Sequence, residues 1–247
     1  MPPEKTDITG DLVSGGIGLV GALVGALAAY QFGLRAAKLA SKASEDERDK
    51  FAAFSVIHKL GLIYTAQTAI YLHMTEATER VKTMKFSPHV SMAMKHLANL
   101  PQRIAFNTDE VYRVGSFAGK DVLNTLMMLD SQHNSTIDHL TYFTAEKAAF
   151  RRHIKGDVQG DVIVTGWTKA EYKAVEPQVL GMDQMVGEML RYSEGDMKRA
   201  HDTIVAIVKA RGPRFCDKSE YKLRGLDGKD EFVKPDPAPK PKFGWSR

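Results

Sequence analysis

Three glycines near the N-terminus, Gly16, Gly18 and Gly21, form the dinucleotide-binding pattern G-x-G-x-x-G. That pattern binds a pyrophosphate where a strand precedes it, a helix begins within it and an acidic residue follows about 20 positions later. In this chain only residues 12–14 of the apolar run precede the glycine pattern, which is too short for a strand, and the apolar run continues far beyond the last glycine. We therefore assign these glycines another role and expect no dinucleotide site.

A second glycine pair, Gly115 and Gly119, is followed by Lys120 and resembles a phosphate-binding loop at first sight. The phosphate-binding pattern has four residues between its glycines and a Ser or Thr after its lysine. This chain has three residues between them, and Asp121 after the lysine would repel a phosphate. The pattern instead predicts a turn followed by the start of a helix.

The eight histidines form no metal-ligating pattern. A metal site needs His, Cys or carboxylate ligands at ligand spacing. His89 and His96 share a helix face, but no carboxylate or thiol lies at ligand spacing with them. A carboxylate lies near an imidazole in Asp130/His133 and in Asp138/His139, and helix surfaces produce such pairs routinely. We expect no metal.

His58 and His73 lie in an apolar segment and would ligate a haem only if a second element held the opposite face. No nucleophile elbow, zinc-protease or kinase pattern occurs in the chain. The sequence therefore predicts no cofactor and no catalytic residue, and favours a protein that is not an enzyme.

The longest apolar stretch runs from Leu12 to Leu34, with no charged residue between Asp11 and Arg35. As a helix it would be about 34 Å long, enough to cross a hydrocarbon core of about 30 Å. We predict a single transmembrane helix here. Two alternatives stay open: a signal peptide, although the preceding residues are acidic, and a buried helix of a soluble protein.

Small side chains recur along this stretch at helical spacing. Small faces let a second helix approach closely within a membrane. They predict helix packing against another membrane subunit or a second copy of the chain. The candidate packing residues are Gly18, Gly21, Ala22, Gly25, Ala26, Ala29 and Gly33.

Basic residues follow the stretch directly, at Arg35, Lys38 and Lys42. Positive residues stay on the cytoplasmic side of a membrane, or on the matrix side in a mitochondrion, and they lie near anionic lipid head groups. We therefore predict a short outside segment, residues 1–11, and an inside body. The predicted location is a mitochondrial or bacterial inner membrane.

The composition excludes several protein classes. The net charge of +4 is spread along the chain, and no Lys/Arg block with interleaved aromatic residues occurs, so we expect no nucleic-acid partner. Cys216 is the only cysteine, which excludes a disulfide scaffold within one chain.

Apolar periodicity and capping signals predict a helical body over residues 35–212. Residues 44–50 are either a charged hinge or a helical continuation beyond the membrane surface, and Ser44 and Glu47 form a capping-box pattern that favours a helix start here. The helix is expected to reach about Met84, and its apolar part, residues 60–74, is either a buried or interfacial helix or a second membrane crossing. Further helices are expected at 88–100, after Asn107 or Thr108, from Lys120 to about Ile154, from Thr168 to Pro177, at 178–192 and at 195–211. Residues 156–166 are strand-like, and we interpret them as a loop because no partner strand is apparent.

Residues 213–247 show no helical or strand period and hold five of the ten prolines. We predict an extended arm that lies on a partner surface. Its candidate contact residues are Pro235, Pro237, Pro239, Pro241, Phe243 and Trp245.

The predicted fold is mainly α: a transmembrane helix over 12–34, an irregular bundle of amphipathic helices and a Pro-rich arm. The predicted function is a non-catalytic, membrane-anchored accessory subunit that helps assemble or stabilise a multi-subunit membrane complex. Accessory subunits of the respiratory chain and ATP synthase share this general plan, which is an analogy of architecture. The alternatives are a membrane-bound regulator or adaptor, a phage or secretion-system membrane component, and a haem or metal redox protein.

Overall fold

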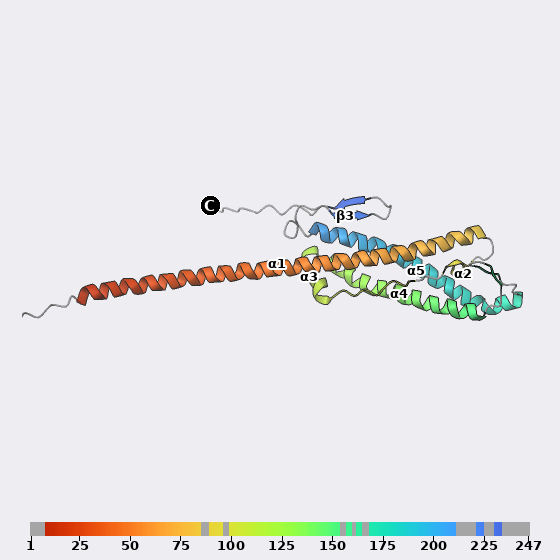
Figure 1. Cartoon of the computed structure of the whole chain (residues 1–247), viewed down its shortest axis with the longest axis horizontal. Coiled ribbons are helices and arrows are strands. Elements are labelled where there is room, and N and C mark those ends of the chain that lie inside the picture. Colours follow the sequence, from red (N-terminus) through yellow and green to blue (C-terminus); the bar gives the residue numbers. More distant parts are fainter. Residues whose placement is uncertain are drawn as a thin grey trace, which may run out of the picture. The chain divides into compact units, whose positions relative to one another are not determined.

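A computed structural model describes the backbone of most of the chain (Figure 1). The described residues are 8–84, 89–95, 99–153, 157–159, 162–164, 168–210, 221–224 and 230–233, and side chains are described for 29–83, 89–95, 99–152 and 168–210. The protein is mainly helical, as predicted. Its contacts divide the chain into two units, Met1–Arg48 and Asp49–Arg247.

Five helices and four short strands follow one another along the described residues. They are α1 (Ile8–Met84), α2 (Val90–Ala93), α3 (Thr108–Ala118), α4 (Lys120–His153), β1 (Asp157–Gln159), β2 (Val162–Val164), α5 (Lys169–Ala210), β3 (Tyr221–Arg224) and β4 (Asp230–Val233). The second unit is built mainly on α1 from residue 49 onward, α4 and α5.

The core positions of these three long helices alternate in steps of three and four residues. Such a period, close to 3.5 residues, is typical of helices that pack side by side along their whole length. The bundle is therefore more regular than predicted. The buried positions that follow these steps are 53, 56, 60, 63, 67, 70, 74 and 77 in α1, 122, 126, 129, 133, 136, 140, 143, 147 and 150 in α4, and 179, 182, 186, 189, 193, 196, 200, 203 and 207 in α5. Five further described residues of these helices are buried beside them: Ala52, Ile137, Met197, Ile204 and Val208.

Two apolar clusters fix the directions of the helices. The first joins residues 52–63 of α1 to the beginning of α4 and the end of α5. The second joins residues 70–77 of α1 to α2, the end of α4 and the beginning of α5. Because α1 and α4 enter the clusters in the same order and α5 in the reverse order, α5 runs antiparallel to the other two (Figure 1).

Residues 104–106, just before α3, are held by side chains of α4. Asn134 accepts a hydrogen bond from the backbone of Ile104 at 3.2 Å and donates one to its carbonyl at 2.9 Å. Asp130 accepts from the backbone of Phe106 at 3.2 Å. Polar residues on α4 thus hold a strand-like segment that has no sheet to join.

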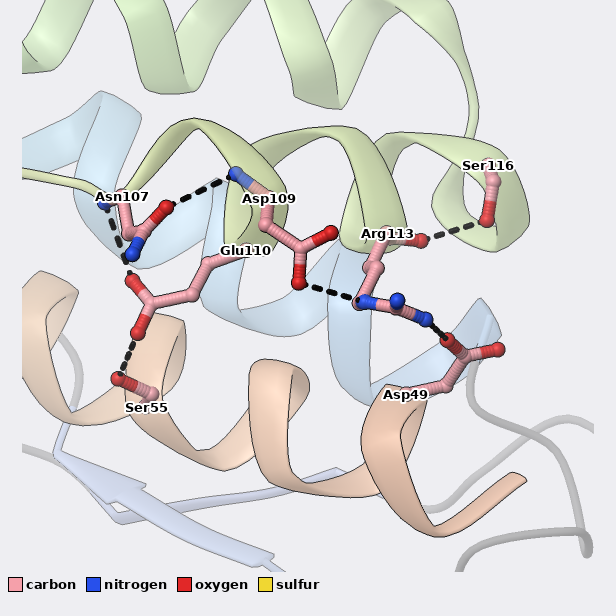
Figure 2. A network of polar contacts seen from close by, with 7 residues as sticks. All are labelled: Asp49, Ser55, Asn107, Asp109, Glu110, Arg113 and Ser116. Carbon is pink, nitrogen blue, oxygen red and sulfur yellow. Dashed lines mark hydrogen bonds and ion pairs between the residues drawn. The ribbon is translucent and has the colours of Figure 1, made fainter. Parts of the chain in front are cut away.

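Helix α3 begins at a capping box and is tied to α1 (Figure 2). The Asn107 side chain accepts from the backbone of Asp109, and the Glu110 carboxylate accepts from the backbone of Asn107. The same carboxylate also accepts from Ser55 at 2.7 Å and Lys59 at 2.6 Å. Burial raises the pKa of Glu110, but these hydrogen bonds outweigh it and the net pKa is lowered.

The second tie between α3 and α1 is made by Arg113. Its guanidinium donates to Asp109 of its own helix at 2.7 Å and to Asp49 of α1 at 3.2 Å (Figure 2). Together with Glu110 it fixes α3 against α1 at two points.

The turn predicted at Gly115–Gly119 joins α3 to α4 and serves packing. Gly119 has φ 101°, a conformation that side-chain-bearing residues rarely adopt. A Cβ at Gly115 would lie 2.7 Å from Cδ1 of Leu123, so glycine lets α3 approach α4 closely.

Several predicted element boundaries are wrong. No helix begins at Ser44, because residues 35–50 hold neither Gly nor Pro and α1 continues through them. Of the helix predicted over 88–100, the described residues form only α2, Val90–Ala93, and its C-cap residue Met94 is in extended conformation. Helix α5 continues through Pro177 and across Ser193–Gly195, since Val175, Val179, Ser193 and Asp196 lie on its packed side.

The interpretation of residues 156–166 as a loop is also wrong. β1 and β2 form an antiparallel hairpin in which Val158 pairs with Ile163. The strand-like Val162–Val164 therefore has its partner immediately before it in the chain. Within the region predicted to lack periodic structure, β3 and β4 form a second hairpin that pairs Lys222 with Phe232.

Among the residues that the structure describes, none of the helices combines the length and the apolar character that a membrane crossing requires. Residues 60–74 are among these residues, and Leu60, Ile63, Ile70 and Met74 are buried in the two clusters, so the buried-helix interpretation is confirmed there. Residues 12–28 of the predicted transmembrane helix lie outside the described side chains. That helix stays a prediction.

Candidate functional site

A layer of polar side chains separates the two apolar clusters of the bundle. The side-chain Nε2 of Gln67 on α1 donates a 3.1 Å hydrogen bond to Nδ1 of His133 on α4, and both side chains are fully buried. Nε2 of His133 lies 3.3 Å from the carbonyl of Gln102. Burial lowers the pKa of His133, against smaller opposing effects of Gln102 and Asp130, which favours the neutral imidazole.

Ser193 and Asp196 occupy core positions of α5, and both are fully buried. Asp196 accepts a 2.8 Å hydrogen bond from Arg199, which also donates to Gln132 of α4 at 2.9 Å. Burial raises the pKa of Asp196, and Arg199 partly opposes this. Three buried oxygens, on Gln67, Ser193 and Asp196, have no hydrogen-bond partner among the described residues.

A second polar cluster holds α2 at both ends. The ammonium of Lys147, on α4, donates to the carbonyls of Ser91, at 2.6 Å, and Met94. At the other end, the backbone N–H of Ser91 donates to Asp183 of α5 at 2.8 Å. A cation at the carbonyl end of a helix and a carboxylate at its N–H end match the helix dipole. Lys147 also explains why α2 is short, because it binds carbonyls that a longer helix would use.

His89 extends this cluster toward the beginning of α5. Its Nδ1 lies 2.6 Å from Asp183 and its Nε2 lies 2.7 Å from the hydroxyl of Tyr172. The order carboxylate, imidazole, hydroxyl resembles a catalytic triad, but the hydroxyl is a phenol and all three groups join α2 to α5. We assign them to holding the segment.

Lys147 is a buried cation, 7% exposed. Burial, together with the smaller effects of the neighbouring charges of Arg151 and Arg80, lowers its pKa to about 7. Its ammonium also lies 5.8 Å from the ring centre of Phe143. Carbonyl dipoles and an aromatic face thus surround this charge.

Beside Lys147 lies a cavity of about 200 Å³. It is lined by the end of the α2 segment and one face of α4, namely by Met94, Lys95, Leu140, Phe143, Thr144, Lys147, Ala148 and Arg151. Its apolar residues Met94, Leu140 and Phe143 belong to the second apolar cluster. Its basic residues are Lys95, which follows α2, and Lys147 and Arg151 of α4.

The outward face of α1 carries exposed apolar side chains. Within the second unit the exposed positions recur at 51, 54, 58, 62, 65, 69 and 72, again in steps of three and four. Phe51, Phe54, Leu62 and Leu72 are the large apolar residues among them, and Phe51 is 75% exposed.

Only part of the predicted packing stripe can be located. Ala29 and Gly33 are exposed positions of α1, and a Cβ at Gly33 would meet nothing within 4 Å. Gly18, Gly21, Ala22, Gly25 and Ala26 lie outside the described side chains. The basic residues Arg35, Lys38 and Lys42 are exposed.

The predicted arm contacts at Pro235, Pro237, Pro239, Pro241, Phe243 and Trp245 lie outside the described residues. Among the described residues, no group of three or more His, Cys, Asp or Glu side chains could hold a metal ion. The two haem candidates do not pair: His58 is exposed, and His73 hydrogen-bonds to the carbonyl of Lys95.

Sequence reasoning missed Gln67 and Lys147, although each occupies a core position of its heptad pattern. His133 was considered beside Asp130, as a metal ligand. The signal for Gln67, His133 and Lys147 is a polar residue at a position where the steps of three and four residues predict an apolar one.

Comparison with protein-family models, with curated proteins and with solved structures finds no match to this chain. The functional argument therefore rests on the residues themselves.

Proposed function

We propose that this chain is a non-catalytic, membrane-anchored subunit that helps assemble or stabilise a multi-subunit membrane complex. The observation that carries the proposal is the extent of α1, which runs from Ile8 to Met84. The apolar stretch 12–34 and the core positions 53–77 of the bundle belong to this one helix. A membrane segment and a folded body on the same helix are suited to anchoring.

The polar clusters of the described residues support a structural role. His133 bonds to Gln67, His89 bonds to Asp183, and Lys147 bonds to backbone carbonyls. Each group holds one segment of the fold against another, which suits a scaffold more than a catalyst.

The exposed apolar residues of α1 support binding to a partner. Phe51, Phe54, Leu62 and Leu72 are exposed along one face of the helix, and exposed apolar side chains that gather on one face are found at protein interfaces. We propose further that the span packs through its small residues and that residues 213–247 reach a neighbouring subunit. Respiratory-chain and ATP-synthase complexes of a bacterial or mitochondrial inner membrane are candidate assemblies, with the body on the cytoplasmic or matrix side.

The variant Gly21→Leu with Gly25→Leu tests the packing stripe. We expect it to enter the membrane fraction as the wild type does, since leucine is at least as apolar, but to be lost from its complex on a native gel. The matched control is Val20→Leu with Val24→Leu, at the same depth but outside the stripe, which should leave the complex intact. Unchanged migration of the glycine variant would show that the stripe is not an interface.

A further inference from the structure

The cavity beside Lys147 has the size of a small-molecule site. Its volume is about 200 Å³. An apolar protein cavity of about 150 Å³ is large enough to bind benzene. A ligand with one aromatic ring or a short branched chain therefore fits.

The lining specifies the chemistry of such a ligand. Leu140, Phe143 and Met94 are buried apolar residues that would contact a hydrocarbon body. Lys95, Lys147 and Arg151 supply positive charge, and none of the described lining residues is acidic. The lining thus combines an apolar wall with a basic one.

The positive charge at the cavity is concentrated. Arg151 and Arg80 both lie close enough to Lys147 to lower its pKa. Arg80 has a carboxylate within reach, Glu76 at 3.5 Å, whereas Lys147 binds neutral carbonyls. An anion in the cavity would offset the repulsion among these cations.

We propose that the cavity between the α2 segment and α4 binds a small organic monocarboxylate, with its apolar body against Leu140 and Phe143 and its carboxylate among Lys95, Lys147 and Arg151. This goes beyond the proposed scaffold function, because it gives the bundle a ligand site of its own. Binding there would link α2 and α4, which Lys147 already joins.

The test uses the full chain in detergent and two probes, 4-fluorobenzoate and its neutral isostere 4-fluorobenzamide, followed by fluorine NMR. We expect saturable binding of the benzoate with a dissociation constant of about 1 mM or tighter. The benzamide should bind at least about tenfold more weakly, which separates the site from partition into the micelle.

Two variants locate the binding. Arg151→Gln removes an exposed lining charge and should weaken benzoate binding about fivefold or more while leaving benzamide unchanged. Ala148→Leu keeps a good helix former at an exposed lining position and should block both probes by filling the cavity. Arg152→Gln is the matched control, because Arg152 is exposed next to Arg151 but does not line the cavity.

The proposal is wrong if benzoate shows no saturable binding, or if benzamide binds equally well. It is also wrong if the Arg151 variant binds benzoate as the Arg152 control does. If circular dichroism shows that the Ala148→Leu variant does not fold, the comparison of Arg151→Gln with Arg152→Gln still tests the proposed site.

Discussion

A hydrogen bond between Gln67 and His133 crosses the three-helix core between its two apolar clusters. Polar residues at core positions of helical bundles reduce stability but fix the register of the helices, since a shifted alignment leaves them unpaired. We infer that this bond holds α1 against α4 in the observed alignment, and that Arg199, which donates to Asp196 of α5 and to Gln132 of α4, holds α5.

Removing one partner of this bond should be costly. His133→Leu leaves the Gln67 amide buried without its partner, and we expect the free energy of unfolding to fall by about 1–3 kcal/mol. The double variant Gln67→Leu/His133→Leu should recover most of that loss, because two apolar side chains of similar size replace the pair. Urea unfolding of the full chain in detergent measures both. A double variant no more stable than the single one would contradict this account.

The buried imidazole should also make stability depend on pH. Burial lowers the pKa of His133 in the folded protein, so below the ordinary histidine pKa of about 6.5 the unfolded chain binds a proton that the folded chain does not. Stability should therefore be retained above about pH 6.5 and fall as the pH drops below it. The same double variant should show a shallower fall between pH 7 and 5. If the free energy of unfolding fell equally with pH in the wild type and in the double variant, His133 would not be the source of the pH dependence.

At the scale of elements, the α3–α4 junction depends on the absence of a side chain at Gly115. Gly115→Ala should lower the free energy of unfolding by about 1–3 kcal/mol, because its Cβ would meet Leu123 at 2.7 Å. Gly187→Ala in α5 is the matched control: no atom lies within 4 Å of its Cβ, and alanine should add about 0.5–1 kcal/mol. Thermal unfolding followed by circular dichroism compares the two, and equal effects would contradict the packing role of Gly115.

Elements set by local signals were predictable from the sequence. The capping residues Asn107 and Thr168 and the apolar steps of α4 placed three helix starts and one long helix within a residue or two. Elements set by distant contacts were not. α2 is shortened by Lys147, more than 50 residues away, and α5 continues through Pro177 because both sides of the proline are packed.

The same division applies to the candidate sites. The cavity is lined by α4 and by Met94 and Lys95, about 50 residues earlier in the chain, so no local sequence motif predicts it. Gln67 and His133 could have been paired only by recognising one heptad register in two helices. Fold class was accessible from periodicity, whereas the polar clusters required the alignment of the helices.

At the scale of the whole molecule, the proposed scaffold assigns separate tasks to separate segments. Among the residues whose side chains are described, the members of the bundle core lie between 52 and 208. Replacing residues 235–247 by a Gly/Ser segment of equal length should therefore weaken assembly without changing unfolding of the body. Native-gel migration and urea unfolding of the same variant test both parts. Unchanged assembly would mean that the proposed arm contacts no partner.

The most direct test of the account is gentle detergent extraction from the native source, followed by native-gel migration and mass spectrometry of the band. The account predicts that the chain is found in the membrane fraction and migrates in a large, stoichiometric complex with other subunits. Migration of the chain alone, or its recovery without detergent, would contradict the proposed membrane-anchored assembly function.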